Sequence, residues 1–218
     1  MKRHKHKLIW DERYKRGLIY GRDPSHAAKL AVLEGYVKAE DKVAELGGGY
    51  GRNSAFFSEM GAHPTLIEIS EVALKLAHAH HPAVKTLELD LTALLPAVYH
   101  GVYDTVFCNF VLHLLDPHER MAMIENARTL LRDGGRAVWS LVSIEDEEFG
   151  KGKRIDRNTF ALARDGRAFH FFDRTEIEQL FENGWKLERV KHCDEIEQIV
   201  SAVKKTDFWF VVAKKVSA

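Results

Sequence analysis

The sequence predicts an α/β protein built on a doubly wound parallel sheet. Strand-like and helix-like segments alternate through five units, and two further strand-like segments close the chain. A glycine-rich turn joins the first strand to the helix that follows it, as in sheets that bind a ligand at their carboxyl edge. The length of 218 residues fits one domain with a full hydrophobic core.

The glycine turn is the segment around which the chain is organised. Residues 42–46 predict a short buried strand, residues 47–51 contain four glycines, and residues 53–57 predict the start of a helix. A strand that passes through glycines into a helix presents free backbone N–H groups and the positive end of a helix dipole. Glycine is favoured there because a Cβ atom holds a ligand away and penalises positive φ.

The spacing of the glycines indicates the kind of ligand. A dinucleotide site needs G-x-G-x-x-G, but Arg52 stands where its third glycine belongs. The pattern present is acidic-x-G-x-G-x-G, with Glu45 as the acidic residue. A carboxylate at this point repels a pyrophosphate and suits a ligand with an amine. The alternative is a tight strand-to-helix turn that binds no ligand.

The remaining elements follow from the pattern of apolar residues. A helix is predicted from Pro117 to the pair Gly134 and Gly135. The later strands are predicted at residues 65–69, 84–89, 102–108, 136–142, 185–190 and 204–214. Glu68 lies at the end of the second strand, about 20 residues after the glycines, where doubly wound folds place an acidic residue on the ribose. The alternative for Glu68 is an exposed charge or a helix cap.

The glycine motif resembles the first motif of the class I S-adenosylmethionine-dependent methyltransferases. The resemblance implies a Rossmann-like sheet of seven strands, mostly parallel, with an antiparallel C-terminal strand. It implies S-adenosyl-L-methionine as cofactor and S-adenosyl-L-homocysteine as product. The third strand then ends on Asp90 at the adenine, although Glu88 is close enough to leave that choice open. The implied cofactor-binding residues are Glu45, Gly47, Gly48, Gly49, Gly51, Glu68, Ile69, Asp90, Leu91, Asn109 and Phe110.

The chain most resembles the small-molecule methyltransferases of the tellurite-resistance and thiopurine type. Residues 1–24 are expected to form an N-terminal arm that covers the active site, and residues 25–218 the methyltransferase domain. The polar stretch at about 143–172 interrupts the alternation and is predicted to be a lid-like insertion. The resemblance implies a direct in-line methyl transfer to a small-molecule substrate. A base is needed only if the acceptor must lose a proton, and the candidates are His170, His113 and Tyr20, which equally suit pocket lining or packing.

Two other functions compete with this hypothesis. The basic arm Lys2–Lys7 suits an RNA or DNA methyltransferase, although a frayed, solvated terminus is favoured. Lys plus Arg and Asp plus Glu both number 32, and the Asn-Pro-Pro-aromatic motif is absent after the fourth strand, so nucleic acid is disfavoured as a partner. A non-catalytic module that binds the cofactor or a partner protein is the second alternative. The acceptor atom and the oligomeric state are left open.

No metal site or membrane segment is expected. Only His78 and His81 of the histidine group share a helix face, and two ligands make a poor metal site. The two cysteines lie far apart in the sequence, which fits free thiols in a reducing compartment. The N-terminus lacks the apolar stretch of a signal peptide, so a cytoplasmic location is expected.

Overall fold

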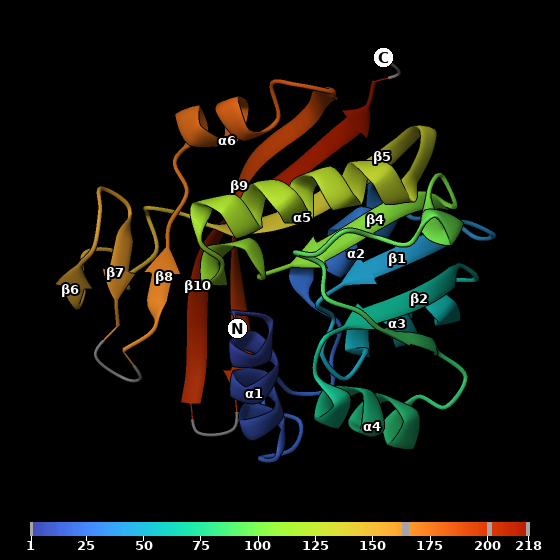
Figure 1. Cartoon of the computed structure of the whole chain (residues 1–218), viewed down its shortest axis with the longest axis horizontal. Coiled ribbons are helices and arrows are strands. Elements are labelled where there is room, and N and C mark those ends of the chain that lie inside the picture. The colour runs from blue at the N-terminus through green and yellow to red at the C-terminus, as the bar shows by residue number, and fades with distance from the viewer. Residues whose placement is uncertain (1, 163–165, 200–201, 217–218) are drawn as a thin grey trace.

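The computed structural model describes residues 2–162, 166–199 and 202–216 (Figure 1). Its main sheet has seven strands in the order β3-β2-β1-β4-β5-β10-β9. These strands are β1 (Lys42–Leu46), β2 (His63–Glu68), β3 (Lys85–Glu88), β4 (Tyr103–Asn109), β5 (Leu131–Val142), β9 (Trp185–Ile199) and β10 (Ala202–Lys215). Pairing is parallel from β3 to β5 and antiparallel for β5–β10 and β10–β9. The predicted fold class is therefore confirmed.

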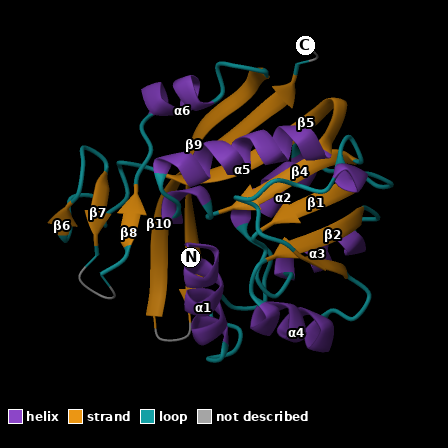
Figure 2. Cartoon of the chain, in the orientation of Figure 1, coloured by secondary structure: helices purple, strands orange, loops and turns teal. Residues whose placement is uncertain are grey.

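Helices cover both faces of the sheet (Figure 2). In the described residues they are α1 (Lys2–Tyr14), α2 (His26–Leu33), α3 (Arg52–Glu59), α4 (Glu71–His80), α5 (Pro117–Leu130) and α6 (Arg174–Leu180), with short 3₁₀ turns η1 (Ala97–Tyr99) and η2 (Leu112–Leu114). Apolar side chains of α5 and α6 pack with Trp139 and Val106 on one face. Those of α2 and α3 pack with Phe107 and Val138 on the other. Alternate residues of β4 and β5 thus supply the two halves of the core.

The prediction for the end of α5 was wrong. The helix begins as expected, with Asp116 and Glu119 forming a capping box around Pro117, but it ends at Leu130. The two glycines lie inside β5 instead. A Cβ at Gly135 would lie 3.0 Å from the carbonyl oxygen of Asp104, so glycine permits the close approach of β4. Glycine here serves strand packing rather than helix termination.

The last two strands are longer than predicted. Phe208 of β10 pairs with Val142, the last residue of β5, so residues 202–207 pair with β9 alone. This distal hairpin, residues 194–199 and 202–207, extends past the carboxyl edge of the main sheet. In Figure 1 it runs downward beside α1. It therefore forms a wall next to the edge where such folds bind ligands.

The polar stretch after β5 is folded. It carries a small antiparallel sheet of β6 (Lys153–Arg154), β7 (Thr159–Ala161) and β8 (Ala168–His170). Phe160, Phe169 and Phe171 bury their rings beneath this sheet, together with Val142 of β5. The small sheet therefore rests on its own apolar cluster.

The basic arm is also folded, and the expectation of a frayed terminus was wrong. Residues 2–7 form the first half of α1. The Lys7 ammonium donates to Glu88 Oε1 at 3.0 Å and to the Ile69 carbonyl at 3.4 Å. The Asp11 carboxylate accepts from the Ser70 hydroxyl at 2.7 Å. These contacts hold α1 against the carboxyl ends of β2 and β3 and the start of α4.

Candidate functional site

The glycine turn has the backbone that the sequence predicts. Gly47, Gly49 and Gly51 have φ values of 64°, 60° and 79°, which L side chains rarely adopt. Gly51 is the left-handed N-cap of α3, so the turn leads directly into the helix N-terminus. The turn lies between β1 and α3 at the point where strand order reverses from β1 to β4. Backbone N–H groups therefore converge at the topological switch point.

Glu45 lies buried beneath the turn. Its Oε1 accepts from Asn53 Nδ2 at 2.9 Å, and its Oε2 accepts from the Ser54 amide at 2.9 Å and the Ser54 hydroxyl at 2.5 Å. Burial raises the pKa of Glu45, and these hydrogen bonds oppose the shift. Both oxygens are thus used to tie β1 to α3. Direct contact between Glu45 and the cofactor stays a prediction.

Glu68 reaches the glycine turn from the neighbouring strand. Its Oε2 accepts from the Gly49 amide at 2.9 Å, and its Oε1 accepts from the amides of Ile69 and Ser70 at 2.8 and 2.9 Å. Burial raises the pKa of Glu68, while the three backbone donors favour the charged form. The structure therefore places this carboxylate beside the turn, where hydroxyl donors of a ribose are expected.

The third strand offers two acidic residues, which differ in burial. Asp90 is 6% exposed, and its Oδ1 accepts from the amide and hydroxyl of Thr92 at 2.9 and 2.7 Å. Glu88 is half exposed and pairs with Lys7 of α1. Leu91, also predicted for the adenine wall, is buried beside Asp90. Burial favours Asp90 over Glu88 for an adenine contact, which stays a prediction.

The end of β4 carries an unsatisfied acceptor and a strained backbone. Asn109 Oδ1 is buried and has no hydrogen-bond partner among the described residues. Phe110 follows with φ of 53°, an uncommon value for a bulky side chain. Val111 lies so close to the turn that a Cβ at Gly47 would be 2.7 Å from its methyl group. Unsatisfied buried groups and strained residues concentrate at functional sites.

These groups fit the expected cofactor. Glu68 and Asp90 are acceptors for ribose hydroxyls and an amino group, and Asn109 Oδ1 is an acceptor for an ammonium. Gly48 leaves no room for a side chain, because a Cβ there would collide with Glu45 and Leu66. Glycine at this position therefore permits the turn to pack closely on β1 and β2.

Helix α1, part of the arm that the resemblance places over the active site, lies over this edge and contacts the turn through Tyr14. The Tyr14 side chain is 5% exposed and lies against Gly49, where its hydroxyl fills the space of a missing Cβ. Burial, and then the neighbouring Glu68 carboxylate, raise the pKa of Tyr14 well above its usual value. The resemblance predicted that the N-terminal arm covers the site, but no sequence pattern paired Tyr14 with Gly49.

The structure separates the three candidate bases. His113 lies beside the end of β4, with its ring 6.4 Å from Phe110 and 4.2 Å from Phe169. Tyr20 lies next to the turn, where its amide donates to the Tyr50 hydroxyl at 3.0 Å. His170 follows Phe169 on β8, so the two side chains point to opposite faces of the small sheet. Phe169 packs in the apolar cluster, and His170 bonds to Thr159 and Glu176. Its catalytic role stays a prediction, but it is not brought together with Glu68 or Asn109.

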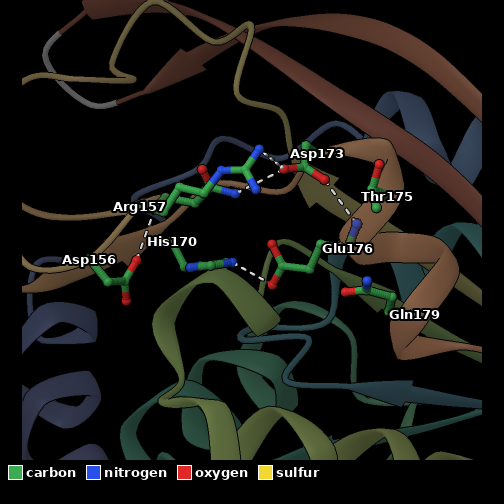
Figure 3. A pocket seen from close by; sticks show the side chains of 8 residues that line it. Asp156, Arg157, His170, Asp173, Thr175, Glu176 and Gln179 are labelled. Atoms are coloured by element: carbon green, nitrogen blue, oxygen red, sulfur yellow. Dashed lines mark hydrogen bonds and ion pairs between the residues drawn. The ribbon is translucent and has the colours of Figure 1, made fainter.

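His170 lines a separate polar pocket of about 350 Å³ near the start of α6. Its Nδ1 lies 2.7 Å from the Thr159 hydroxyl, and its Nε2 lies 2.8 Å from Glu176 Oε1. Figure 3 shows the ring directed at Glu176 between Asp156 and Asp173. Hydrogen bonds from Glu176 N to Asp173 Oδ1 fix the start of α6. The pocket thus joins the small sheet to α6.

A larger cavity of about 680 Å³ adjoins the glycine turn. Arg52, the residue after Gly51, lies in its wall and donates to the Tyr20 and Asp23 carbonyls at 2.8 and 3.0 Å. The same guanidinium pairs with Glu197 of the distal hairpin. No sequence signal indicated Glu197 or its neighbour Glu195, because their position depends on how far the hairpin extends. The lining residues are Tyr20, Gly21, Arg22, Asp23, Pro24, His26, Lys29, Arg52, Asp194, Glu195, Ile196 and Glu197.

Two expected absences concern the described part of the chain alone. There, no group of three His, Cys, Asp or Glu residues is arranged to hold a metal ion. Among the helices described, none combines the length and apolar character needed to cross a bilayer. Cys108 and Cys193 are both free and buried.

Comparisons with known proteins identify similar methyltransferases. Residues 43–135, which contain the turn, Glu68 and Asn109, match the family described as "Methyltransferase domain". A curated relative, the ribosomal protein L11 methyltransferase of Staphylococcus carnosus (strain TM300), is 28% identical over 151 residues. That match covers 66% of this chain and 46% of the relative, so the chain spans about half the relative's length.

Solved structures share the fold over almost the whole chain. A S-adenosylmethionine-dependent methyltransferase of Methanosarcina mazei superposes with a TM-score of 0.74 at 16% identity, covering 86% of this chain and 98% of that one. The Burkholderia thailandensis 1,6-didemethyltoxoflavin-N1-methyltransferase, solved with 1,6-didemethyltoxoflavin and S-adenosylhomocysteine, has a TM-score of 0.69 at 19% identity. That match covers 98% of this chain and 90% of the other.

Proposed function

We propose that this chain, a class I S-adenosylmethionine-dependent methyltransferase with S-adenosylmethionine as its cofactor, methylates a small-molecule acceptor. We also propose a role for each of three segments of the chain. Residues 1–24 serve as the N-terminal cover, residues 25–218 form the catalytic domain, and residues 143–172 form a lid. The free thiols of Cys108 and Cys193 agree with a cytoplasmic location.

The observation that carries the small-molecule proposal is the enclosure of the carboxyl edge. Helix α1 lies on the turn through Tyr14, and the distal hairpin flanks the turn through the pairing of Glu197 with Arg52. The small sheet adds a third wall, because Phe169 packs on His113. A cavity of about 680 Å³ lies between the distal hairpin and residues 20–29, beside Arg52. Small-molecule pockets typically enclose about 300–1,000 Å³, whereas a folded RNA or protein needs an open surface.

The cofactor supplies an electrophilic methyl group on a sulfonium. Glu68 is placed to hold the ribose and Asn109 Oδ1 to accept a hydrogen bond from the ammonium. Tyr14 and Trp10 exclude water from the turn. The protein then orients the acceptor nucleophile in line, and well-achieved positioning contributes about 7–11 kcal/mol. No acid is needed for the leaving sulfide, and a base acts only where the acceptor loses a proton.

A second candidate acceptor is a protein, because the curated relative is a ribosomal protein L11 methyltransferase. We test the three acceptor classes together with labelled S-adenosylmethionine, using a metabolite extract, total ribosomal protein and total RNA. Label in the low-molecular-weight fraction supports the proposal. Label in protein or RNA alone contradicts it, and binding of S-adenosylhomocysteine with no transfer in any pool indicates a non-catalytic module.

A further inference from the structure

We propose that the cavity between residues 20–29 and the distal hairpin receives an amine acceptor, and that Glu195 recognises its N–H group. This inference rests on the proposed function and names the substrate class of the same site. It concerns a residue and a wall that lie outside the matched methyltransferase family region, residues 43–135.

Glu195 is a buried carboxylate with one oxygen unused. The side chain is 7% exposed and lies in the cavity wall. Its Oε1 accepts from the His26 amide at 2.6 Å. Its Oε2 is buried and has no hydrogen-bond partner among the described residues. A buried acceptor left unsatisfied costs about 1–3 kcal/mol, so its retention indicates a donor that arrives with a ligand.

The neighbouring cations do not supply a hydrogen bond to Glu195 Oε2. Arg52, the cation placed at the centre of the wall, already pairs with Glu197 and donates to two backbone carbonyls. No described cation lies within ion-pair distance of Glu195. Burial, and then the nearby Glu197 carboxylate, raise the pKa of Glu195 to about 7, while Arg52 and Lys29 oppose the shift. The charged and titratable groups of the wall are Arg22, Asp23, His26, Lys29, Arg52, Asp194, Glu195 and Glu197.

This set of groups selects an amine over other small nucleophiles. Four carboxylates and the cations Arg22, Lys29 and Arg52 line the cavity, and Arg52 is already paired with Glu197. An ammonium or N–H group supplies the donor that Glu195 Oε2 lacks, in a site where a charge-assisted hydrogen bond is strong. Because the pKa of the carboxyl is near neutral, it also suits the transfer of a proton from nitrogen.

The cavity wall is continuous with the edge that holds the cofactor. The His26 ring lies 6.2 Å from Phe208, and Phe208 lies 5.3 Å from Phe110 at the end of β4. Arg52 directly follows Gly51 of the turn. Phe208 thus connects the cavity wall, through His26, with the end of β4, which carries Asn109 and Phe110.

The chemical step is balanced without another reactant. Glu195 Oε2 accepts one proton from the acceptor ammonium, which frees the nitrogen lone pair. That lone pair forms the new N–C bond as the S–C bond breaks, and its electron pair stays on sulfur. The products are the N-methylated ammonium, S-adenosylhomocysteine and one proton, which Glu195 holds and then releases to solvent.

The test compares ligands of one carbon skeleton that differ in a single group. The ligands are phenethylamine, 2-phenylethanol and 3-phenylpropionate, together with a fragment set of similar matched triplets. Binding is measured by calorimetry and protein-observed NMR, with and without S-adenosylhomocysteine. The variant is Glu195→Gln. Glu188→Gln is its control, because Glu188 lies on the same strand and pairs with Arg136 outside the cavity.

We expect amines to bind best, with chemical-shift changes at His26 and Arg52. Glu195→Gln should weaken amine binding tenfold or more, and Glu188→Gln should not change it. Glu195→Asp keeps the carboxylate but shortens the side chain by one methylene. Its amine affinity should lie between those of the wild type and Glu195→Gln. Equal binding of the alcohols or acids, absence of amine binding, or an unchanged affinity in Glu195→Gln overturns the inference.

The same samples separate this inference from the proposed function. If wild-type protein binds S-adenosylhomocysteine but shows no preference for amines, the inference fails and the proposed function stands. If it binds amines but not S-adenosylhomocysteine, the proposed function fails. Should Glu195→Gln not fold, the Glu195→Asp variant and the wild-type ligand preference still decide the question.

Discussion

The Tyr14 hydroxyl occupies the space that a side chain at Gly49 would need. One residue belongs to a helix at the start of the chain and the other to the glycine turn after β1. The same Gly49 donates its amide to Glu68. Access to the turn is therefore set by α1 as well as by the turn's own backbone.

Gly49→Ala should destabilise the protein more than Gly101→Ala does. Both glycines have positive φ, 60° and 67°, but Gly101 has open space where a Cβ would be. Gly101→Ala therefore measures the backbone strain alone. The collision with Tyr14 should add about 1–3 kcal/mol to the loss of unfolding free energy, measured by urea denaturation. Equal losses of unfolding free energy in the two variants would show that the Tyr14 side chain moves aside without destabilising the protein.

Glu68→Ala should weaken S-adenosylhomocysteine binding by roughly tenfold or more, because hydrogen bonds to a charged group are worth about 1.5–3 kcal/mol. Glu71→Ala is the control, since Glu71 begins the adjacent helix and pairs with exposed Lys75. Calorimetry measures the affinity, and circular dichroism checks the fold. An affinity equal to that of Glu71→Ala assigns Glu68 a structural role, joining Gly49 to the end of β2.

The residues predicted to bind the cofactor, in the glycine turn and at the end of β2, could be found from the sequence because their signals are local. Glycines with positive φ, an acidic residue before them and Glu68 at the next strand end are all readable as short-range patterns. Their placement at one sheet edge follows from parallel topology. The antiparallel pairing of the last two strands followed from the family resemblance.

The residues that surround the proposed acceptor site could not be predicted in the same way. Tyr14 and Glu195 reach the site only through contacts between distant segments, with Gly49 and His26 respectively. The basic arm was misjudged because Lys7 pairs with Glu88, which lies on another strand. His170 was favoured by the aromatic residues around it, but alternation on β8 directs it to Glu176.

His170→Ala should reduce stability, because it leaves the Thr159 hydroxyl and Glu176 without their shared partner. The expected loss is about 1–3 kcal/mol in urea denaturation. The sequence also predicts a loss of turnover larger than any loss of cofactor affinity. Turnover per folded molecule measures that effect separately. Normal turnover with reduced stability would restrict His170 to joining the small sheet to α6.

Glu195→Gln should change the pH dependence of stability. The folded carboxyl has its pKa raised to about 7 from a usual 4.5, so the folded state holds its proton more tightly. The wild type therefore loses stability as pH rises from about 4.5 to about 7, and the variant lacks that loss. The gap between the two proteins should widen by up to about 3 kcal/mol between pH 4.5 and pH 8. A constant gap across this range would contradict the raised pKa, and Glu188→Gln provides the control.

The length of the distal hairpin has a consequence for the order of synthesis. The turn, Glu68 and Asn109 leave the ribosome early, whereas Glu195 follows several seconds later at roughly 5–20 residues per second. Strand β10 must also insert between β5 and β9 before that wall exists. The glycine turn and its contact with Glu68 can thus form in a nascent chain before the neighbouring cavity has its second wall.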